Sequence, residues 1–426
     1  MLVIGAGQAG LAVSRELRER DVEHLVVERA RVGQAWLHRW DSFTLVTPNW
    51  TLDLPGSPYD GDDSEGHVVR DEIVRYLETY QQRWSVPVRE GVRVDRLRAG
   101  TSTRFQLETS VGDMTADAVV VCTGAFQRPH RPIEGRFPED VQVLDAIDYS
   151  NPQALPPGNV LVVGSGQTGC QLAEELHLAG RQVFVACGRA PWAPRRLDGI
   201  DIVTWLARVG FYDQRLEDLG SPADRLVANS QATGAAGGHD LHYRTLQQLG
   251  VVLLGRLASV DGHRVSFVDD LAASVAFGDA RWADARNVLA QRLPGHGYAV
   301  PDLPIPASFS YTPMTELDLR GFGAVIFTTG YRPDYRWIEF PISDPIGFPV
   351  TIDGASPTVP GLYFCGVHTM RTRRSGFLFG VGIDAAVVAD TIAARAMRSQ
   401  RGIAPSRTQP VPLEPAPEQG PGTGEH

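Results

Sequence analysis

Two segments of this chain repeat the same plan of an apolar strand, a glycine turn, a helix and a second strand. The first spans residues 1–29 with GAGQAG at 5–10, and the second spans 159–189 with GSGQTG at 164–169. In the GxGxxG pattern the first glycine permits a tight turn, the second admits a pyrophosphate to the backbone, and the third lets helix and strand approach. The helix N-terminus then faces the phosphates with partial positive charge. Two complete units predict two dinucleotide sites, one formed by Gly5, Gly7 and Gly10 and one by Gly164, Gly166 and Gly169.

The residue at the end of each second strand distinguishes the two ligands, because it meets the adenosine ribose. Glu28 holds this position in the first unit, where a carboxylate can accept hydrogen bonds from both ribose hydroxyls, which suits FAD or NAD. The equivalent residue of the second unit is Cys187, followed by Arg189 and by the pair Arg195 and Arg196. With no carboxylate to repel a 2′-phosphate and with a guanidinium to bind it, the second site is predicted to take NADPH. The alternative for each arginine is an ordinary surface side chain in solvent.

The chain length and two proline-punctuated strands predict the domain organisation. At 426 residues the chain exceeds what one hydrophobic core sustains. The strand and connection ADAVVVCTGAFQRPHRP leave the first unit, and FGAVIFTTGYRPDY, at residues 322–335, is expected to return to it. We therefore predict an α/β fold of two Rossmann-like dinucleotide-binding domains, with the NADPH domain inserted into a discontinuous FAD domain. The expected bounds are 1–150 and 318–400 for the FAD-binding domain, 151–317 for the NADPH-binding insert and 401–426 for a proline- and glycine-rich disordered tail.

Charge and hydropathy restrict the partners. The formal net charge is −10, which disfavours nucleic acid and anionic membranes because no basic stripe offsets phosphate repulsion. No apolar run reaches the roughly 20 residues that span a bilayer, and the N-terminal MLVIGAG is unlike a signal peptide. We expect a cytoplasmic protein that acts on a small molecule, with the oligomeric state left open.

Several chemistries are excluded by what the sequence lacks. The chain has no lysine, so all 40 basic side chains are arginines, and Schiff-base chemistry and a Walker phosphate loop are ruled out. The four cysteines form no CxxC, which excludes a dithiol disulfide reductase and predicts buried apolar side chains. His239, Asp240 and His242 could suggest a metal site, but no partner motif accompanies them, so no metal is predicted. A loop that orders the domain interface or the substrate entrance is preferred.

These features resemble the class B flavoprotein monooxygenases, which comprise flavin-containing monooxygenases, Baeyer-Villiger enzymes and N-hydroxylases. The likeness extends from Met1 to about Ala396 and includes GLYFCG at 361–366 and GVGIDAA at 380–386. The resemblance implies that Gly366 and Asp384 lie near the flavin and that the last helix directs its N-terminus at the flavin ring.

The segment GQAWLHRWDSFTLVTPNWTLDLP, residues 33–55, resembles the stretch that covers the isoalloxazine in this family. Trp36, Arg39, Trp40 and Asp41 stand in corresponding places, and we expect Trp36 and Asp41 to take part in cofactor binding. Relatives carry an asparagine nearby that orients NADP and oxygen. Here Asn49 and Thr47 are the nearest polar candidates for a catalytic role, with the alternative that they only shape a TPN turn.

The chain departs from the family pattern at its FxGxxxH fingerprint. The corresponding segment, FPEDVQVLDAIDY at 137–149, lacks the glycine and has Asp145 where histidine is expected. Tyr149 disfavours the Baeyer-Villiger branch. The N-hydroxylase motif matches at Thr328 to Tyr331, but Gly323 replaces the aspartate that should precede it, so amino-acid N-hydroxylation is not supported.

The resemblance implies an FAD-dependent, NADPH-consuming monooxygenase that transfers oxygen from O₂ to a small organic molecule through a C4a-(hydro)peroxyflavin. The cofactor performs that chemistry, which explains why no catalytic dyad of side chains is visible. Two alternatives stay open: a non-oxygenating NADPH-dependent flavin reductase or electron-transfer enzyme, and a redox sensor that binds both nucleotides without turnover.

Overall fold

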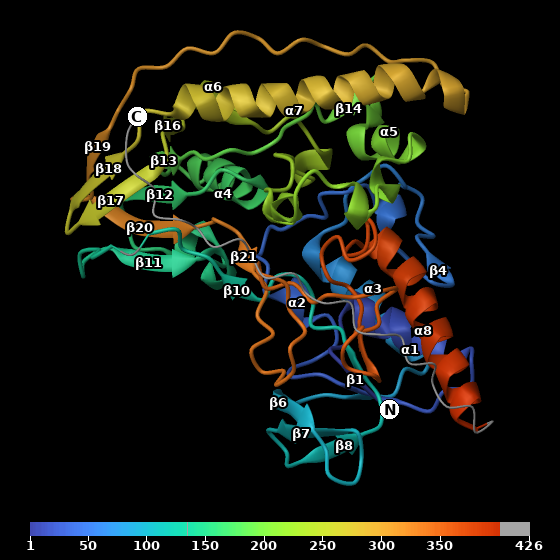
Figure 1. The fold of residues 1–426 in the computed structure, drawn as a ribbon. Helices are drawn as coiled ribbons and strands as arrows, with labels where there is room; N and C mark the ends of the chain where they lie inside the picture. The colour runs from blue at the N-terminus through green and yellow to red at the C-terminus, as the bar shows by residue number, and fades with distance from the viewer. Residues whose placement is uncertain (134, 401–426) are drawn as a thin grey trace, which may run out of the picture.

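The protein is described here from a computed structural model that covers residues 1–133 and 135–400. The predicted disordered tail at 401–426 lies outside the described residues. Two parallel sheets, one in each domain, form the centre of the molecule, and Figure 1 shows the second domain above the first. Among the described residues, no helix combines the length and apolar character that crossing a membrane requires.

The first domain is built on a five-stranded parallel sheet. Its strands are short apolar runs such as LVI and VVV with both faces buried, as expected when helices cover both sides of a parallel sheet. Helix α1 (Gln8–Arg18) lies against the last helix, α8 (Leu378–Gln400), and α3 (Arg70–Arg83) also packs against α1. In spatial order the strands are β22 (Leu362–Phe364), β9 (Val119–Val121), β1 (Leu2–Ile4), β2 (Leu25–Val27) and β5 (Val88–Arg89).

The second domain repeats this architecture. Helix α4 (Gln167–Leu178) follows its first strand through the second glycine motif and packs against α6 (Tyr243–Leu249). In spatial order the strands are β11 (Gln142–Asp145), β20 (Phe322–Phe327), β12 (Asn159–Val163), β13 (Val183–Ala186) and β16 (Val252–Leu254), all parallel.

The sheet pairing places the domain crossings differently from the bounds expected at residues 150 and 318. Strand β11 precedes residue 150 but pairs with β20, and β20 follows residue 318 but pairs with β12. Strands β20 and β11 lie on the side of β12 that faces away from β13. Without them β12 would be an exposed edge of the second sheet, and their apolar runs suit this buried position. By sheet membership the insert extends from about Gln142 to Phe327.

The two crossings between the domains run side by side. Strand β10 (Arg128–Pro129) pairs antiparallel with β21 (Tyr331–Arg332), and the His130 N–H donates to the Gly330 carbonyl at 3.0 Å. These hydrogen bonds join the outgoing and returning chains, so the domains are connected by a paired ribbon rather than by two independent linkers.

The second domain carries a layer that the glycine motifs did not predict. Helix α7 (Leu271–Arg292) lies along the top of the molecule in Figure 1, and α5 (Ile202–Arg208) packs below one end of it. Their shared core is rich in tryptophan and contains Trp192, Trp205 and the fully buried Trp282. The remaining strands form small antiparallel sheets: β6 (Val94–Ala99), β7 (Phe105–Thr109), β8 (Met114–Ala116), β17 (Leu257–Asp261), β18 (Arg264–Phe267), β19 (Glu316–Asp318), β3 (Asp53–Leu54), β4 (Ser57–Pro58), β14 (Arg196–Leu197) and β15 (Ile200–Asp201).

Candidate functional site

The first glycine loop has the geometry that a phosphate-binding turn requires. Gly5 adopts a φ of +103°, and a Cβ on Gly10 would lie 1.8 Å from the Gly5 carbonyl oxygen, so helix α1 touches the turn directly. Gly7 is the N-cap of α1, receives no side-chain cap, and has no atom within 4 Å of an added Cβ. The first turn of α1 also has no acidic side chain. Its uncapped N–H groups therefore face open space suited to an anion.

Glu28 joins the first glycine loop to the segment that follows β2. One carboxylate oxygen accepts from the Ala6 N–H at 2.8 Å, and the other accepts from the Ala30 N–H at 3.0 Å. Each oxygen has a second lone pair, so the predicted contacts with ribose hydroxyls remain geometrically available.

Two predicted residues, Trp36 and Gly366, lie at the N-terminus of α1. The Trp36 indole donates to the Gln8 side-chain oxygen at 3.2 Å, and the Gln8 amide donates to the Gly376 carbonyl at 2.8 Å, just before α8. A Cβ on Gly366 would lie 2.5 Å from the Ala9 methyl group, so only glycine permits this approach. The glycine loop, the flavin-covering segment and the beginning of α8 therefore border one region.

Asp384 and Asp41 have protein partners instead. Asp384 is buried in α8 and accepts from the Arg371 guanidinium at 3.1 Å, while burial raises its pKa. Asp41 is exposed and accepts from Asn151 at 2.7 Å and from Arg70 at 3.0 Å, and these hydrogen bonds lower its pKa. Both carboxylates anchor neighbouring segments, and a direct contact of either with a cofactor stays a prediction.

The second glycine loop reproduces the first. Gly164 has a φ of +108°, and a Cβ on Gly169 would lie 2.0 Å from the Gly164 carbonyl oxygen. Gly166 begins α4 without a side-chain cap or an acidic residue in the first turn, and an added Cβ would meet only the Ala228 methyl group at 3.3 Å. This helix N-terminus is also suited to a phosphate.

The ribose end of the second site is ordered by a hydrogen-bond network that sequence reasoning missed. The Ser165 hydroxyl accepts from the Gly188 N–H at 2.9 Å and contacts the Tyr243 hydroxyl at 2.6 Å. Cys187, expected where Glu28 lies in the first unit, is fully buried, and Arg189 is exposed. Tyr243 comes from α6, far along the chain, so no local motif could have indicated it.

The three predicted arginines separate in space. The Arg189 guanidinium lies over the Phe277 ring, 5.8 Å from its centroid. Arg196 donates to the carbonyls of Gly237 and Gly238. Arg195 is turned away from the ribose end into the domain interface, where it is 2% exposed. Among these three, Arg189 alone stays available for a 2′-phosphate.

The segment predicted to cover the flavin is held from within its own loop. The Asn49 side chain donates to the Asp63 carbonyl at 2.9 Å and accepts from the Val68 N–H at 2.7 Å. The Thr47 hydroxyl contacts the Thr51 hydroxyl at 2.6 Å. Because both amide groups of the buried Asn49 have partners, its contacts position the loop, and contact with a nucleotide stays a prediction.

A buried polar cluster of His67, Arg195 and Asp201 joins this loop to the second domain. Arg195 lies 2.5 Å from an Asp201 oxygen and donates to the Val46 carbonyl at 2.7 Å. The His67 Nδ1 lies 3.0 Å from the Leu45 carbonyl, and its Nε2 lies 3.2 Å from Arg195. A neutral imidazole that donates from Nδ1 and accepts at Nε2 satisfies both contacts. The Nε and Nη1 atoms of Arg195 have no hydrogen-bond partner among the described residues.

His67 is expected to make the domain interface sensitive to acid. Burial, together with the positive charge of Arg195, lowers its pKa from 6.5 to about 4. The unfolded chain therefore binds this proton below about pH 6.5, whereas the folded protein binds it only near pH 4. The stability that neutral His67 contributes is complete above about pH 6.5 and is lost as pH falls toward 4. Urea unfolding at about pH 7.5 and about pH 5 should show a lower midpoint in acid.

The matched variant His67→Gln removes the titrating group but keeps a donor and an acceptor. Its midpoint should fall less between these two pH values than that of the natural protein. His242 and His368, whose pKa values burial also lowers to about 4, contribute equally to both proteins. An unchanged pH dependence in His67→Gln would show that His67 does not titrate in this window.

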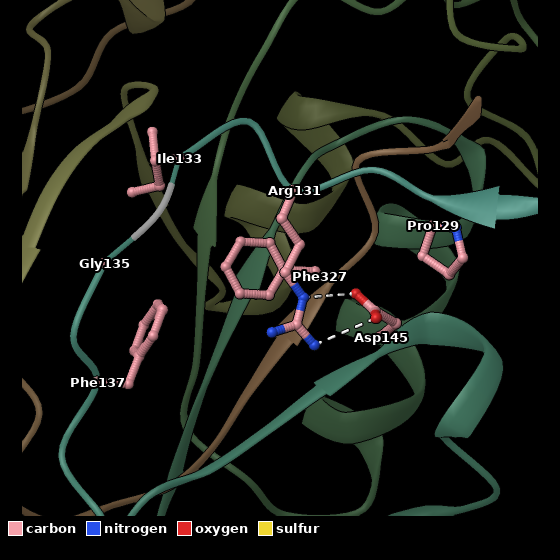
Figure 2. A pocket seen from close by; sticks show the side chains of 7 residues that line it. All are labelled: Pro129, Arg131, Ile133, Gly135, Phe137, Asp145 and Phe327. Carbon is pink, nitrogen blue, oxygen red and sulfur yellow. Dashed lines mark hydrogen bonds and ion pairs between the residues drawn. The ribbon is translucent and has the colours of Figure 1, made fainter.

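Two adjoining hollows lie where strands β11 and β20 end. Figure 2 shows the larger, a cavity of about 450 Å³, with Arg131 beside the Phe327 ring and donating to both Asp145 oxygens at 2.9 and 3.1 Å. The smaller shares Asp145 and Phe327 and extends to Thr168 in the first turn of α4. Ligands of open α/β sheets bind at the carboxyl ends of the strands. The hollows therefore continue the second nucleotide site away from the glycine loop.

The GGHDLHYR loop, residues 237–244, directs its three candidate ligands to separate partners. His239 contacts Glu174 at 2.6 Å, Asp240 accepts from the Arg195 N–H at 2.6 Å, and His242 lies against the Trp192 ring at 4.4 Å. The contact of Asp240 with Arg195 supports the interpretation of this loop as part of the domain interface.

All four cysteines are buried and without disulfides, and burial raises the pKa of each thiol. Thiolate is the reactive form of cysteine, so these side chains are suited to packing rather than to disulfide chemistry.

Comparisons with known proteins agree with this geometry. The profile of a family described as pyridine nucleotide-disulphide oxidoreductase matches residues 2–215. An uncharacterized CzcO-like oxidoreductase of Geobacillus kaustophilus is 30% identical over 389 residues, covering 90% of this chain and 95% of that protein. A probable indole-3-pyruvate monooxygenase of Arabidopsis thaliana, YUCCA8, is 29% identical over 187 residues, covering 41% of this chain and 44% of that protein. A flavin-containing monooxygenase from Stenotrophomonas maltophilia shares the fold, with a TM-score of 0.64, 19% identity and coverage of 93% and 98%.

A first parallel sheet interrupted by a second, each with its own glycine loop, defines an oxidoreductase with two dinucleotide-binding domains. The chain belongs to the pyridine nucleotide-disulphide oxidoreductase family, and it is similar over nearly its whole length to a CzcO-like oxidoreductase. The predicted fold class is confirmed, and so is the prediction of a flavin-dependent oxidoreductase.

Proposed function

We propose that the protein is an FAD-dependent, NADPH-consuming monooxygenase that transfers oxygen from O₂ to a small organic molecule. The observation that carries the proposal is the pair of uncapped helix N-termini at Gly7 and Gly166, each beginning in a glycine loop that touches its helix. Two such cradles in one chain suit two dinucleotides that exchange a hydride.

The first domain would hold FAD. The N-terminus of α1 binds the pyrophosphate, Glu28 accepts from the adenosine ribose, and Trp36 and Gly366 lie beside the first turn of α1. The last helix, α8, begins at this border, so its positive end can favour negative charge on the reduced flavin. When bound and reduced, FAD would be the group that reacts with O₂.

The second domain would hold NADPH. The N-terminus of α4 binds the pyrophosphate. Arg189 receives the 2′-phosphate, which no carboxylate repels because position 187 is a cysteine. The hollow beside Thr168 continues this site along the ends of β20 and β11. The segment with Thr47 and Asn49 is tied to the second domain, where Arg195 donates to the Val46 carbonyl, and we propose that it shields the reaction from water, as a monooxygenase requires.

Replacing Arg189 tests the identity of the second nucleotide. Arg189→Ala should lower kcat/KM for NADPH by about 10- to 150-fold, which corresponds to the loss of one charge-assisted hydrogen bond. It should leave kcat/KM for NADH nearly unchanged. Steady-state measurements with both coenzymes supply the comparison. Equal losses with both would assign Arg189 a folding role instead.

The alternative is an NADPH-dependent flavin reductase that does not oxygenate a substrate. The observation in its favour is Asp145, which stands at the fingerprint histidine and is paired with Arg131. Both functions use the same two nucleotide sites, so the fate of the oxygen separates them.

A further inference from the structure

Helix α7 brings a second arginine to the ribose end of the second nucleotide site. The Arg281 guanidinium lies over the Phe277 ring, 5.5 Å from its centroid, and the Arg189 guanidinium lies 5.8 Å from the same centroid. Phe277 and Arg281 are one helical turn apart, so they share a face of α7. One aromatic ring therefore gathers two guanidinium groups that are 92 positions apart in the sequence.

Close contacts hold α7 beside the segment that follows Arg189. A Cβ on Gly278 would lie 2.8 Å from the Trp192 ring and 3.0 Å from the Ala190 carbonyl oxygen, the residue directly after Arg189. The next residue, Asp279, accepts from the Trp192 indole at 2.9 Å and from the Arg244 guanidinium at 3.0 and 2.8 Å. The backbone of α7 is therefore anchored beside residues 189–192.

The charges around Phe277 favour a doubly negative ligand. Arg189 forms no ion pair among the described residues, and Arg281 pairs with Asp284 at 2.9 Å on a half-exposed surface. A phosphate monoester carries nearly two negative charges and accepts several charge-assisted hydrogen bonds. It can therefore compete with the single Asp284 carboxylate for Arg281.

We propose that Arg189 and Arg281 together form the site for the 2′-phosphate of the nicotinamide nucleotide, with Phe277 positioning both side chains. The inference rests on the proposed function and adds Arg281 as a residue that determines coenzyme specificity. The nucleotide motif ends near Arg189 and α7 begins far downstream, so no local pattern in the sequence indicates Arg281.

The test measures the affinity of the oxidised, FAD-loaded protein for NADP⁺ and NAD⁺ by isothermal titration calorimetry. Arg281→Ala should weaken NADP⁺ binding by about 5- to 30-fold and leave NAD⁺ binding unchanged. The loss is smaller than that of an isolated charge-assisted pair, because Arg281 is exposed and also pairs with Asp284. Arg281→Lys should recover part of the loss. Asp284→Asn should tighten NADP⁺ binding, a gain that misfolding cannot produce. Arg264→Ala is the matched control, because Arg264 forms an exposed pair with Glu316 at 3.0 Å.

The possible outcomes separate the role of Arg281 from the proposed NADPH-dependent function. Adenosine 2′-monophosphate should follow NADP⁺ across the variants and adenosine 5′-monophosphate should not, which assigns the effect to the 2′-phosphate. If Arg189→Ala weakens NADP⁺ but Arg281→Ala and Asp284→Asn leave it unchanged, the role of Arg281 is overturned and the proposed function stands. If the natural protein binds neither NADP⁺ nor NAD⁺, the proposed function is overturned and this inference with it.

Discussion

Gly10→Ala is expected to abolish folding of the first domain, whereas Gly7→Ala, three residues earlier, should leave the fold intact. A methyl group on Gly10 would lie 1.8 Å from the Gly5 carbonyl oxygen, a backbone atom that cannot rotate away. Ordinary overpacking of a core costs about 1–3 kcal/mol, and a clash with fixed backbone exceeds that range. Expression in the soluble fraction and urea unfolding measure the effect.

Gly7→Ala is the matched control, since an added Cβ there meets no atom within 4 Å. Its unfolding midpoint should stay close to that of the natural protein. Its flavin content should nevertheless fall sharply, because the methyl group occupies the path by which a pyrophosphate approaches the backbone. Full flavin retention in Gly7→Ala would contradict the assignment of this loop as a phosphate cradle.

Arg195→Met is expected to destabilise the protein by about 3–5 kcal/mol, the usual cost of leaving one partner of a buried ion pair uncompensated. Arg195 is 2% exposed, Asp201 is fully buried, and the two groups lie 2.5 Å apart. The substitution also removes the donor to the Val46 carbonyl and so releases the loop that carries Thr47 and Asn49. Chemical denaturation measures the loss.

Two further variants identify the cause of that loss. Arg195→Met combined with Asp201→Asn should recover part of the stability, because Asn keeps the acceptor for the Val203 N–H at the start of α5 and removes the buried charge. Arg264→Met, which breaks an exposed pair with Glu316, should cost no more than about 1 kcal/mol. Equal stability of Arg195→Met and the natural protein would show that the pair does not hold the interface.

The fold could be predicted because its determinants are local. Each glycine motif contains the turn, the helix start and the two strands within about 30 residues, and the structure builds both as expected. The domain bounds were displaced because sheet membership is not local. Residues 142–145 and 322–327 each resemble an apolar strand of either domain, and only pairing with β12 and with each other decides between the sheets.

The candidate site was predictable where a motif defines it and not where distant segments meet. Gly5, Glu28 and Gly164 lie where the pattern places them. Arg195 follows the ribose end closely in sequence, yet it turns into the interface because Asp201 and the loop carbonyl of Val46 receive it there. Tyr243 and Arg281 reach the second site from α6 and α7, and no spacing rule connects them to GSGQTG.

Reoxidation of the reduced flavin by oxygen, with and without bound NADP⁺, tests the proposed monooxygenase most directly. The protein is reduced anaerobically with one equivalent of NADPH and mixed with oxygenated buffer, while the flavin spectrum and the hydrogen peroxide yield are followed. We predict that bound NADP⁺ delays both the return of the oxidised flavin spectrum and the release of peroxide, because it shields the site from water. The contradicting result is an immediate return of the oxidised spectrum at the same rate with and without NADP⁺, with full peroxide release in the presence of amine, sulfide and indole substrates. That result would overturn the proposed monooxygenase and establish a reductase.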